Sequence, residues 1–139
     1  MNSLLQKERP TLVSISKNHT LTVCLLDDDP SVVKATSRLL TSAGWEVESF
    51  TDPIEFLDHA ETCKPRVVVL DMLMPVMSGL EVQERLRNIS PSSRVIVLTS
   101  KDDPAVRTKA MQAGAIAFFL KPVRDEEFLT EIESALGRN

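Results

Sequence analysis

Apolar runs alternate with helix-start signals along this chain from residue 21 onward, and this alternation limits its possible folds more than any other feature. The apolar runs cover residues 21–26, 45–50, 66–70, 94–98 and 115–120. Three helix signals are Asp-Pro pairs, in which the aspartate caps the helix and the proline fits its first turn: Asp29-Pro30, Asp52-Pro53 and Asp103-Pro104. Further helices are predicted from Gly79 to Asn88 and after Asp125. Five strands alternating with five helices are typical of a doubly wound parallel sheet.

The hydrophobic pattern separates central strands from an edge strand. Residues 66–70 and 94–98 are almost continuously apolar, as expected for strands that are buried on both faces. Residues 45–50 alternate instead, and Glu46 and Glu48 fall on the side opposite the packed one. This pattern predicts an edge strand with one packed and one solvent-exposed face. The predicted fold class is therefore α/β.

Composition narrows the kind of protein. The chain has 139 residues, the size of one domain, and a net charge of −4 without a concentrated Lys/Arg run. We therefore expect no nucleic-acid-binding surface. No apolar stretch is long enough to cross a membrane and no secretory signal is visible, so we expect a cytoplasmic protein without membrane contact. Cys24 and Cys63 fit no metal-binding spacing and are expected to be structural thiols. Residues 1–20 are predicted to form a flexible tail or a short docking segment, and residues 21–137 the folded domain.

Carboxylates follow two of the predicted strands. Asp27 and Asp28 come directly after the first apolar run, and Asp71 ends the third. In a doubly wound sheet these strands are neighbours, so the three acids are expected to converge at the carboxyl edge of the sheet. Charges of one sign at such short range repel unless a cation lies between them. Oxygen ligands of this kind suit Mg²⁺, which keeps coordination positions free for phosphate oxygens.

Two further strand ends supply groups that fit a phosphoryl group. Thr99 offers a hydroxyl after the fourth apolar run, and Lys121 offers an ammonium after the fifth. Both could bind oxygens of a phosphoryl group attached to Asp71. A carboxylate that acts as a nucleophile forms an acyl phosphate, and the cations would neutralise the charge that develops during transfer. The pattern therefore indicates phosphoryl-transfer chemistry centred on Asp71.

Over residues 21–137 the chain resembles the receiver domains of two-component response regulators, which are CheY-like. The marks that carry the resemblance are the acidic pair Asp27-Asp28, Asp71 followed by Met74-Pro75 and Ser78-Gly79, Thr99-Ser100, and Lys121-Pro122. The resemblance implies a flavodoxin-like sheet with strand order 2-1-3-4-5. It also implies that a sensor histidine kinase or phosphotransfer protein donates a phosphoryl group to Asp71. The stretch from Thr99 to Val106 looks most like receivers that precede LuxR-type DNA-binding domains.

The resemblance also implies roles for individual residues. Asp28 would bind Mg²⁺ directly and Asp27 mainly through water, while Leu73 would supply a backbone carbonyl to the metal. Asp29 matches no family ligand and is expected to cap a helix. An apolar Leu73 side chain cannot orient an attacking water, so we expect slow self-dephosphorylation.

A conformational switch is implied in the same way. Thr99 would move toward the phosphoryl group, Phe118 would turn inward, and the small Ser100 would leave access to the site. The surface that changes would be the fourth helix, fifth strand and fifth helix, through which family members form homodimers or bind outputs.

Two other functions remain as alternatives. One is a receiver-like interaction module that is never phosphorylated. The other is a Mg²⁺-dependent phosphatase of the haloacid dehalogenase type, which needs an acid two residues after its nucleophile, where this chain has Leu73. His19 and His59 lie away from the predicted strand ends, and we expect neither to be a phosphodonor or a ligand. The three methionines that follow Asp71 are expected to pack in the loop.

Overall fold

The computed structural model of the chain describes residues 22–123 and 125–137. The predicted tail, residues 1–20, lies outside the described residues. Five parallel strands form one sheet with the order β3-β2-β4-β5-β6, which confirms the predicted doubly wound α/β sheet. The strands are β2 (Thr22–Leu26), β3 (Glu46–Phe50), β4 (Val67–Leu70), β5 (Arg94–Thr99) and β6 (Ala117–Leu120). The helices between and after them are α2 (Pro30–Ser42), α3 (Pro53–Cys63), α4 (Gly79–Ile89), α5 (Pro104–Gln112) and α6 (Asp125–Ala135).

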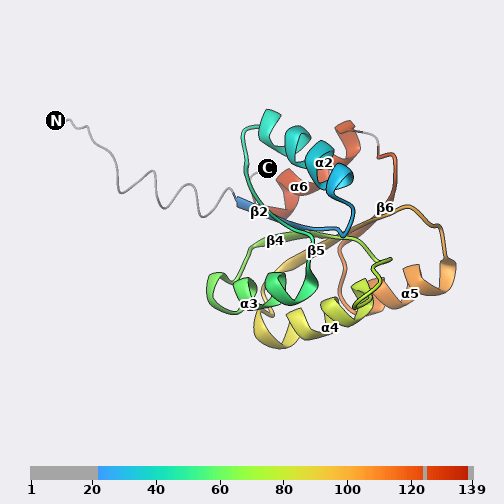
Figure 1. The fold of residues 1–139 in the computed structure, drawn as a ribbon. Helices are drawn as coiled ribbons and strands as arrows, with labels where there is room; N and C mark the ends of the chain where they lie inside the picture. The colour runs from blue at the N-terminus through green and yellow to red at the C-terminus, as the bar shows by residue number, and fades with distance from the viewer. Residues whose placement is uncertain (1–21, 124, 138–139) are drawn as a thin grey trace.

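Helices cover both faces of the sheet, with α2 and α6 on one side and α3, α4 and α5 on the other (Figure 1). Each side has its own hydrophobic core. Side chains alternate between the two faces along a strand. Accordingly Val67 and Val69 of β4 belong to the core under α2 and α6, whereas Val68 and Leu70 belong to the other core. All four are fully buried, so β4 is a central strand as predicted.

Aspartate caps start α2, α3 and α5 as the Asp-Pro pairs predict. Asp29 accepts a hydrogen bond from the Ser31 backbone N–H at 2.9 Å, and Asp52 accepts one from the Ile54 N–H at 3.0 Å. Asp103 accepts from Ala105 N–H at 3.0 Å. These contacts satisfy donors that a helix start would otherwise leave unpaired. The cap assigned to Asp29 is therefore confirmed.

The predicted exposure of Glu46 and Glu48 on β3 is confirmed, but their face of the strand also makes contacts that the pattern does not predict. β3 does lie at the edge of the sheet, but both of its faces carry contacts. Val47 packs against the core under α2 and α6, while Phe50 packs against the core under α3 and meets Phe56 edge to face at 5.7 Å. Glu48 reaches His59 on α3. Helix α3 thus contacts the glutamate face without burying it, because Glu46 and Glu48 both remain exposed.

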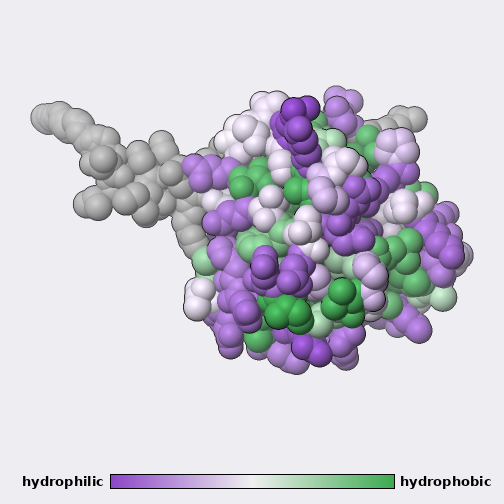
Figure 2. Space-filling view, viewed as in Figure 1, coloured by the Kyte–Doolittle hydropathy of each residue, from purple (hydrophilic) through white to green (hydrophobic). Residues whose placement is uncertain are grey.

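Other departures from the predicted packing are small. The spacing of Ile54 with Phe56, Leu57 and Ala60 predicts that it lies on the buried face of its helix, but Ile54 is 45% exposed. Met72, Met74 and Met77 are buried, as the expectation of loop packing requires. The apolar residues on the face drawn in Figure 2 lie scattered among polar ones. Among the described residues no helix has the length and apolar character needed to cross a bilayer.

Candidate functional site

The carboxyl edge of the sheet brings together the acids and the lysine predicted from the strand ends. Backbone hydrogen bonds continue the sheet past the ends of the strands. The N–H of Asp27 donates to Phe50 O at 3.1 Å, and the N–H of Asp71 donates to Leu26 O at 3.0 Å. On the far side, the Lys121 N–H donates to Thr99 O at 2.8 Å. The sheet itself therefore fixes where these side chains start.

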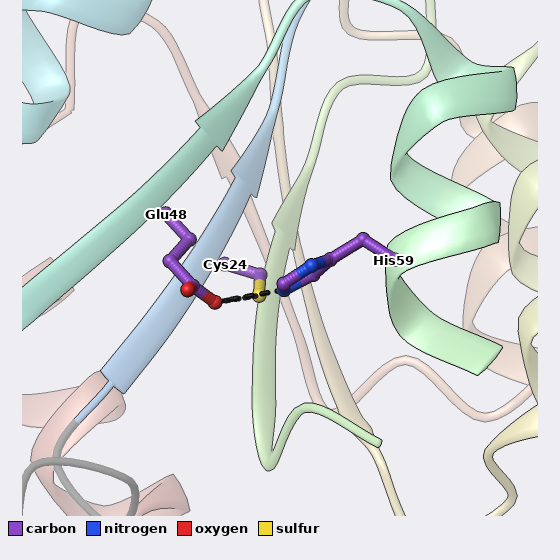
Figure 3. Close-up of side chains that lie close together, drawn as sticks. All are labelled: Cys24, Glu48 and His59. Atoms are coloured by element: carbon purple, nitrogen blue, oxygen red, sulfur yellow. Dashed lines mark hydrogen bonds and ion pairs between the residues drawn. The ribbon is translucent and has the colours of Figure 1, made fainter. Parts of the chain in front are cut away.

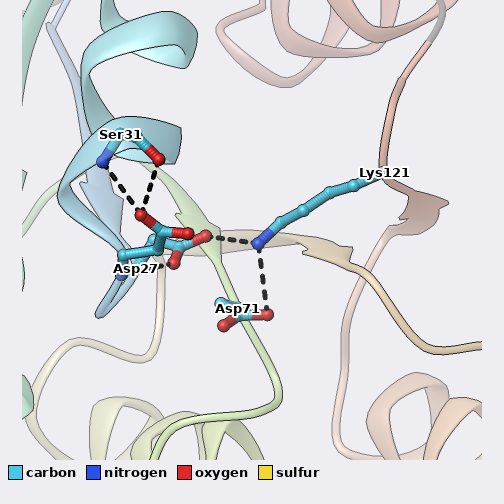
Figure 4. A network of polar contacts seen from close by, with 5 residues as sticks. Asp27, Ser31, Asp71 and Lys121 are labelled. Atoms are coloured by element: carbon cyan, nitrogen blue, oxygen red, sulfur yellow. Dashed lines mark hydrogen bonds and ion pairs between the residues drawn. The ribbon is translucent and has the colours of Figure 1, made fainter.

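Lys121 links two of the acids. Its Nζ lies 2.6 Å from Asp27 Oδ2 and 3.7 Å from Asp71 Oδ1 (Figure 4). The Lys121 side chain is 18% exposed, and those of Asp27 and Asp71 are 3% and 5% exposed. Because so little water screens these charges, their interactions are stronger than those of a surface ion pair. The peptide bond between Lys121 and Pro122 is cis.

Burial raises the pKa of the Asp71 carboxyl above its ordinary value, and the neighbouring Asp27 carboxylate raises it further. Lys121, the Leu73 backbone and the Thr99 hydroxyl act in the opposite direction but do not cancel the effect. Asp71 Oδ1 is buried and accepts no hydrogen bond from any described residue. An added cation would strongly stabilise the charged form of a carboxyl group that is buried in this way.

Both carboxylate oxygens of Asp27 have polar partners. Oδ1 accepts a hydrogen bond from the Asp29 backbone N–H at 3.0 Å, and Oδ2 takes the Lys121 ammonium. The start of α2 then follows, where Ser31 donates its N–H and hydroxyl to Asp29 (Figure 4). Asp27 is thus oriented toward Asp71 by the turn that leads into α2.

The three acids fit a divalent cation. One carboxylate oxygen from each of Asp27, Asp28 and Asp71 lies within 4.8 Å of the other two. Oxygen-only ligands at one open rim are the set expected for Mg²⁺. Asp71 Oδ1, which accepts no hydrogen bond from a described residue, provides a separate reason for a cation at this place.

Thr99 and Phe118 share one face of the sheet. Thr99 ends β5 and is 1% exposed, and its hydroxyl lies close enough to Asp71 to lower the pKa of that carboxyl, although its Oγ1 makes no hydrogen bond of ordinary geometry to a described group. Phe118 pairs with Val97 of β5, two residues before Thr99, and Thr99 itself pairs with Leu120. The side chains of Thr99 and Phe118 therefore point to the side of the sheet that α3, α4 and α5 cover. Phe118 is half-buried, and the Arg107 guanidinium lies 5.2 Å from its ring centre. Ser100 is exposed beside Thr99.

Gly79 is a site residue whose role the sequence does not reveal. The Ser78-Gly79 pair is predicted as a turn and helix entry, and Ser78 does cap α4 by accepting the Glu81 N–H at 3.2 Å. A Cβ on Gly79, however, would lie 2.4 Å from the Asp71 carbonyl oxygen and 2.6 Å from Met72 Cα. Only glycine lets α4 start this close to Asp71. Spacing alone could not show such an approach, since it depends on how the loop folds back.

A groove of about 500 Å³ opens beside the site. Lys121 and Ser31 border it, and Val32, Leu39 and Val123 supply apolar lining between α2 and the segment before α6. The groove connects the charged rim to a surface on which another molecule could rest.

Comparison with known proteins identifies the family. The model of the response regulator receiver domain matches residues 23–133. The response regulator protein TodT of Pseudomonas putida is 39% identical over 114 residues, which make up 82% of this chain and 50% of TodT. The chain thus spans about half the length of the curated relatives it matches first.

Solved receiver structures have the same fold as this chain. A response regulator receiver protein from Burkholderia phymatum is 40% identical and has a TM-score of 0.74, covering 85% of this chain and 96% of its own. The receiver domain of the sensor histidine kinase PA1611 from Pseudomonas aeruginosa PAO1, solved with magnesium coordinated in its active site cleft, shares the fold at 23% identity. Its TM-score is 0.77, and the match covers 84% of this chain and 98% of its own. The chain therefore belongs to the receiver domains of the two-component response regulators, a family of signalling phosphoacceptors rather than metabolic enzymes.

Proposed function

We propose that Asp71 is the phosphoacceptor of this receiver and that a histidine of a sensor kinase or phosphotransfer protein is the donor. The observation that carries this assignment is the position of Asp71. It is a buried carboxylate at the carboxyl edge of a parallel sheet, and its Oδ1 lies 3.7 Å from a lysine ammonium but accepts no hydrogen bond from a described residue. Ligands bind at this edge in doubly wound folds.

In the proposed reaction an Asp71 carboxylate oxygen attacks the phosphorus of the donor phosphohistidine. The new bond joins oxygen to phosphorus, and the phosphorus–nitrogen bond breaks with its electron pair left on the imidazole. The Lys121 ammonium, already 3.7 Å from Asp71 Oδ1, then pairs with a phosphoryl oxygen. The Thr99 hydroxyl, which has no other described partner, donates to a second oxygen.

Receiver domains bind Mg²⁺ in their active site, and we assign its ligands here to Asp27, Asp28, Asp71 and the backbone carbonyl of Leu73. The cation supplies neutralisation of the charge on the transferring phosphoryl oxygens. The Asp27 and Asp28 carboxylates would hold it beside Asp71, with Asp27 acting mainly through water. Lys121 keeps Asp27 in place from the other side.

The proposed output of phosphorylation is a change of the α5-β6-α6 surface. Thr99 would move toward the phosphoryl group and Phe118 would turn inward on the same face of the sheet, while Ser100 leaves the approach open. Half-buried Phe118 has room to change its contacts, since β6 is an edge strand. A homodimer or a downstream partner would recognise this surface. We expect the chain itself to contact neither nucleic acid nor membrane.

We further propose that the phosphodonor protein rests on the groove next to Lys121, because it places apolar surface beside the charged rim. Donor and receiver would meet in the cytoplasm, where the kinase finds ATP. The receiver unit would span residues 21–137.

Phosphorylation can be tested without knowing the kinase. The full chain is incubated with Mg²⁺ and acetyl phosphate or phosphoramidate, and intact mass is measured. We expect one phosphoryl adduct that is absent in Asp71→Ala and is lost when a chelator replaces Mg²⁺. Asp58→Ala is the matched control, because Asp58 is an exposed aspartate on α3 and should leave the adduct unchanged.

Absence of an adduct from wild-type protein would support the alternative of an interaction module that is not phosphorylated. Continuous phosphate release with many turnovers would support the phosphatase alternative instead. That outcome would require a general acid where Leu73 stands, and the Leu73 side chain, 45% exposed, has no group that can donate a proton.

A further inference from the structure

We propose that Cys24, Glu48 and His59 form a second metal site, for Zn²⁺ or a divalent transition metal of similar chemistry, between the β3 edge of the sheet and α3. It lies apart from the acids around Asp71 and needs no phosphorylation. His59 follows no strand end, so its position in the sequence predicts no ligand role for it. The structure places it against two potential ligands that come from neighbouring strands.

The three side chains converge from three elements (Figure 3). Cys24 of β2 and Glu48 of β3 are register partners in the sheet, and His59 reaches them from α3. Glu48 Oε1 lies 2.8 Å from His59 Nε2 and 3.9 Å from Cys24 Sγ, and the ligand atoms of all three lie within 4.8 Å of one another. With bonds of about 2.0–2.3 Å, the ligand atoms around a tetrahedral Zn²⁺ lie roughly 3–4 Å apart. Small rotamer adjustments therefore suffice.

The donor set favours a different metal from the one at Asp71. Thiolate, imidazole and carboxylate together suit Zn²⁺ and its neighbours, whereas the acids at the strand ends offer only the oxygen ligands that Mg²⁺ prefers. The two negative ligands, Cys24 thiolate and Glu48 carboxylate, would balance the charge of a divalent ion. The chain thus carries two sites of distinct selectivity.

The burial pattern gives the ion a route in and an open position. Cys24 is 1% exposed and anchors the inner end of the site. The side chains of His59 and Glu48 are 23% and 48% exposed, so solvent reaches the outer end. Three protein ligands with water in the fourth place is a common arrangement for Zn²⁺.

Cys63 supplies the support that a ligating histidine usually has. Its Sγ lies 3.6 Å from His59 Nδ1, the ring nitrogen away from Glu48, one helical turn along α3. Phe50 holds the ring from the side, with centroids 5.0 Å apart. Partners of this kind orient a ligating imidazole and select the ring nitrogen that binds. On binding, the Cys24 S–H proton leaves to solvent and the imidazole keeps its single proton on Nδ1.

Cobalt binding gives a direct test. The full chain is reduced, stripped with a chelator and kept in excess Mg²⁺ so that the acid cluster is filled, then titrated with Co²⁺. We expect one equivalent to produce a thiolate-to-cobalt charge-transfer band with tetrahedral d–d bands, and Zn²⁺ to abolish them. Zn²⁺ affinity is measured by competition with a chromophoric chelator.

Matched variants locate the site. We expect Glu48→Gln and His59→Ala to weaken Zn²⁺ binding about a hundredfold or more, and Cys63→Ala about tenfold, as for loss of an orienting partner. Glu46→Gln, on the same side of the same strand, and His19→Ala, at the only other histidine, should change nothing. Glu46 and Glu48 are exposed, so substitutions there avoid disturbing the core at Cys24.

Three results would overturn the proposal. One is a Co²⁺ spectrum without a thiolate band. Another is binding that survives both Glu48→Gln and His59→Ala. The third is binding that disappears in Asp71→Ala, which would assign the ion to the acid cluster.

Discussion

The close approach of Gly79 to Asp71 yields the sharpest stability prediction. In Gly79→Ala the new Cβ would meet the Asp71 carbonyl oxygen at 2.4 Å and Met72 Cα at 2.6 Å, and both are backbone atoms that cannot rotate away. Forcing such contacts typically costs about 1–3 kcal/mol. Alanine regains about 0.5–1 kcal/mol through its better helix propensity. We expect a net loss of about 1–2 kcal/mol.

Urea unfolding measures this loss. With an m-value of about 2 kcal/mol per molar, typical of a small domain, the midpoint should fall by roughly 0.5–1 M. Because the clash pushes on the backbone of the residue that carries the site, the yield or rate of phosphorylation by acetyl phosphate should fall in the same variant. This second effect distinguishes a displaced site from a weakened fold.

Gly44→Ala serves as the control. Gly44 has a φ of +97° but no atom within 4 Å of its Cβ position, so alanine there meets strain of roughly 1–2 kcal/mol without a clash. It precedes β3, at the edge of the sheet opposite Asp71. It should lose similar stability and keep normal phosphorylation. If Gly79→Ala unfolds and phosphorylates like wild type, the steric argument is refuted.

Three further predictions concern the core, the acid cluster and the buried thiol. Phe128→Ala should lower the free energy of unfolding by about 3–5 kcal/mol in urea titrations, because Phe128 is fully buried and packs edge to face on Phe119; a loss below 1 kcal/mol would contradict this packing. Without Mg²⁺, Asp71→Asn should melt above wild type at neutral pH. Because the pKa of Asp71 is raised in the folded state, the stability of the wild type falls as pH rises through the range between the unfolded and folded pKa. The difference in melting temperature between Asp71→Asn and wild type should therefore close in acid. Thermal melts across pH check the sign. Burial raises the pKa of Cys24 to about 12, so a maleimide at pH 7 should leave Cys24 unlabelled in the native chain and label it in urea, as read by peptide mass.

The acid and lysine positions could be predicted because topology determines them. Once the alternation establishes a parallel sheet, residues directly after the strands must share one edge, and Asp27, Asp71 and Lys121 are found there. The Asp-Pro caps are equally local, since the capping aspartate contacts N–H groups within three residues.

Features that depend on the placement of helices could not be predicted in this way. Glu48 has the periodicity of a solvent-exposed residue and is exposed, but its contact with His59 of α3 cannot be predicted from that periodicity. Ile54 has the spacing of a core residue, yet it lies at the exposed start of the same helix. A single sequence period describes one element, whereas these environments are created by two.

The position of β4 has a consequence for how the domain could respond to modification. This strand is hydrogen-bonded on both sides and packed on both faces, so the chain that delivers Asp71 acts as a stiff support. The backbone at Asp71 could not move away to make room for a group added to its side chain. Displacement would have to occur where the fold is more compliant, and β6 meets that description as a half-exposed edge strand with a partner on one side only. The fold therefore directs the structural change that follows modification of Asp71 toward β6 and away from β4.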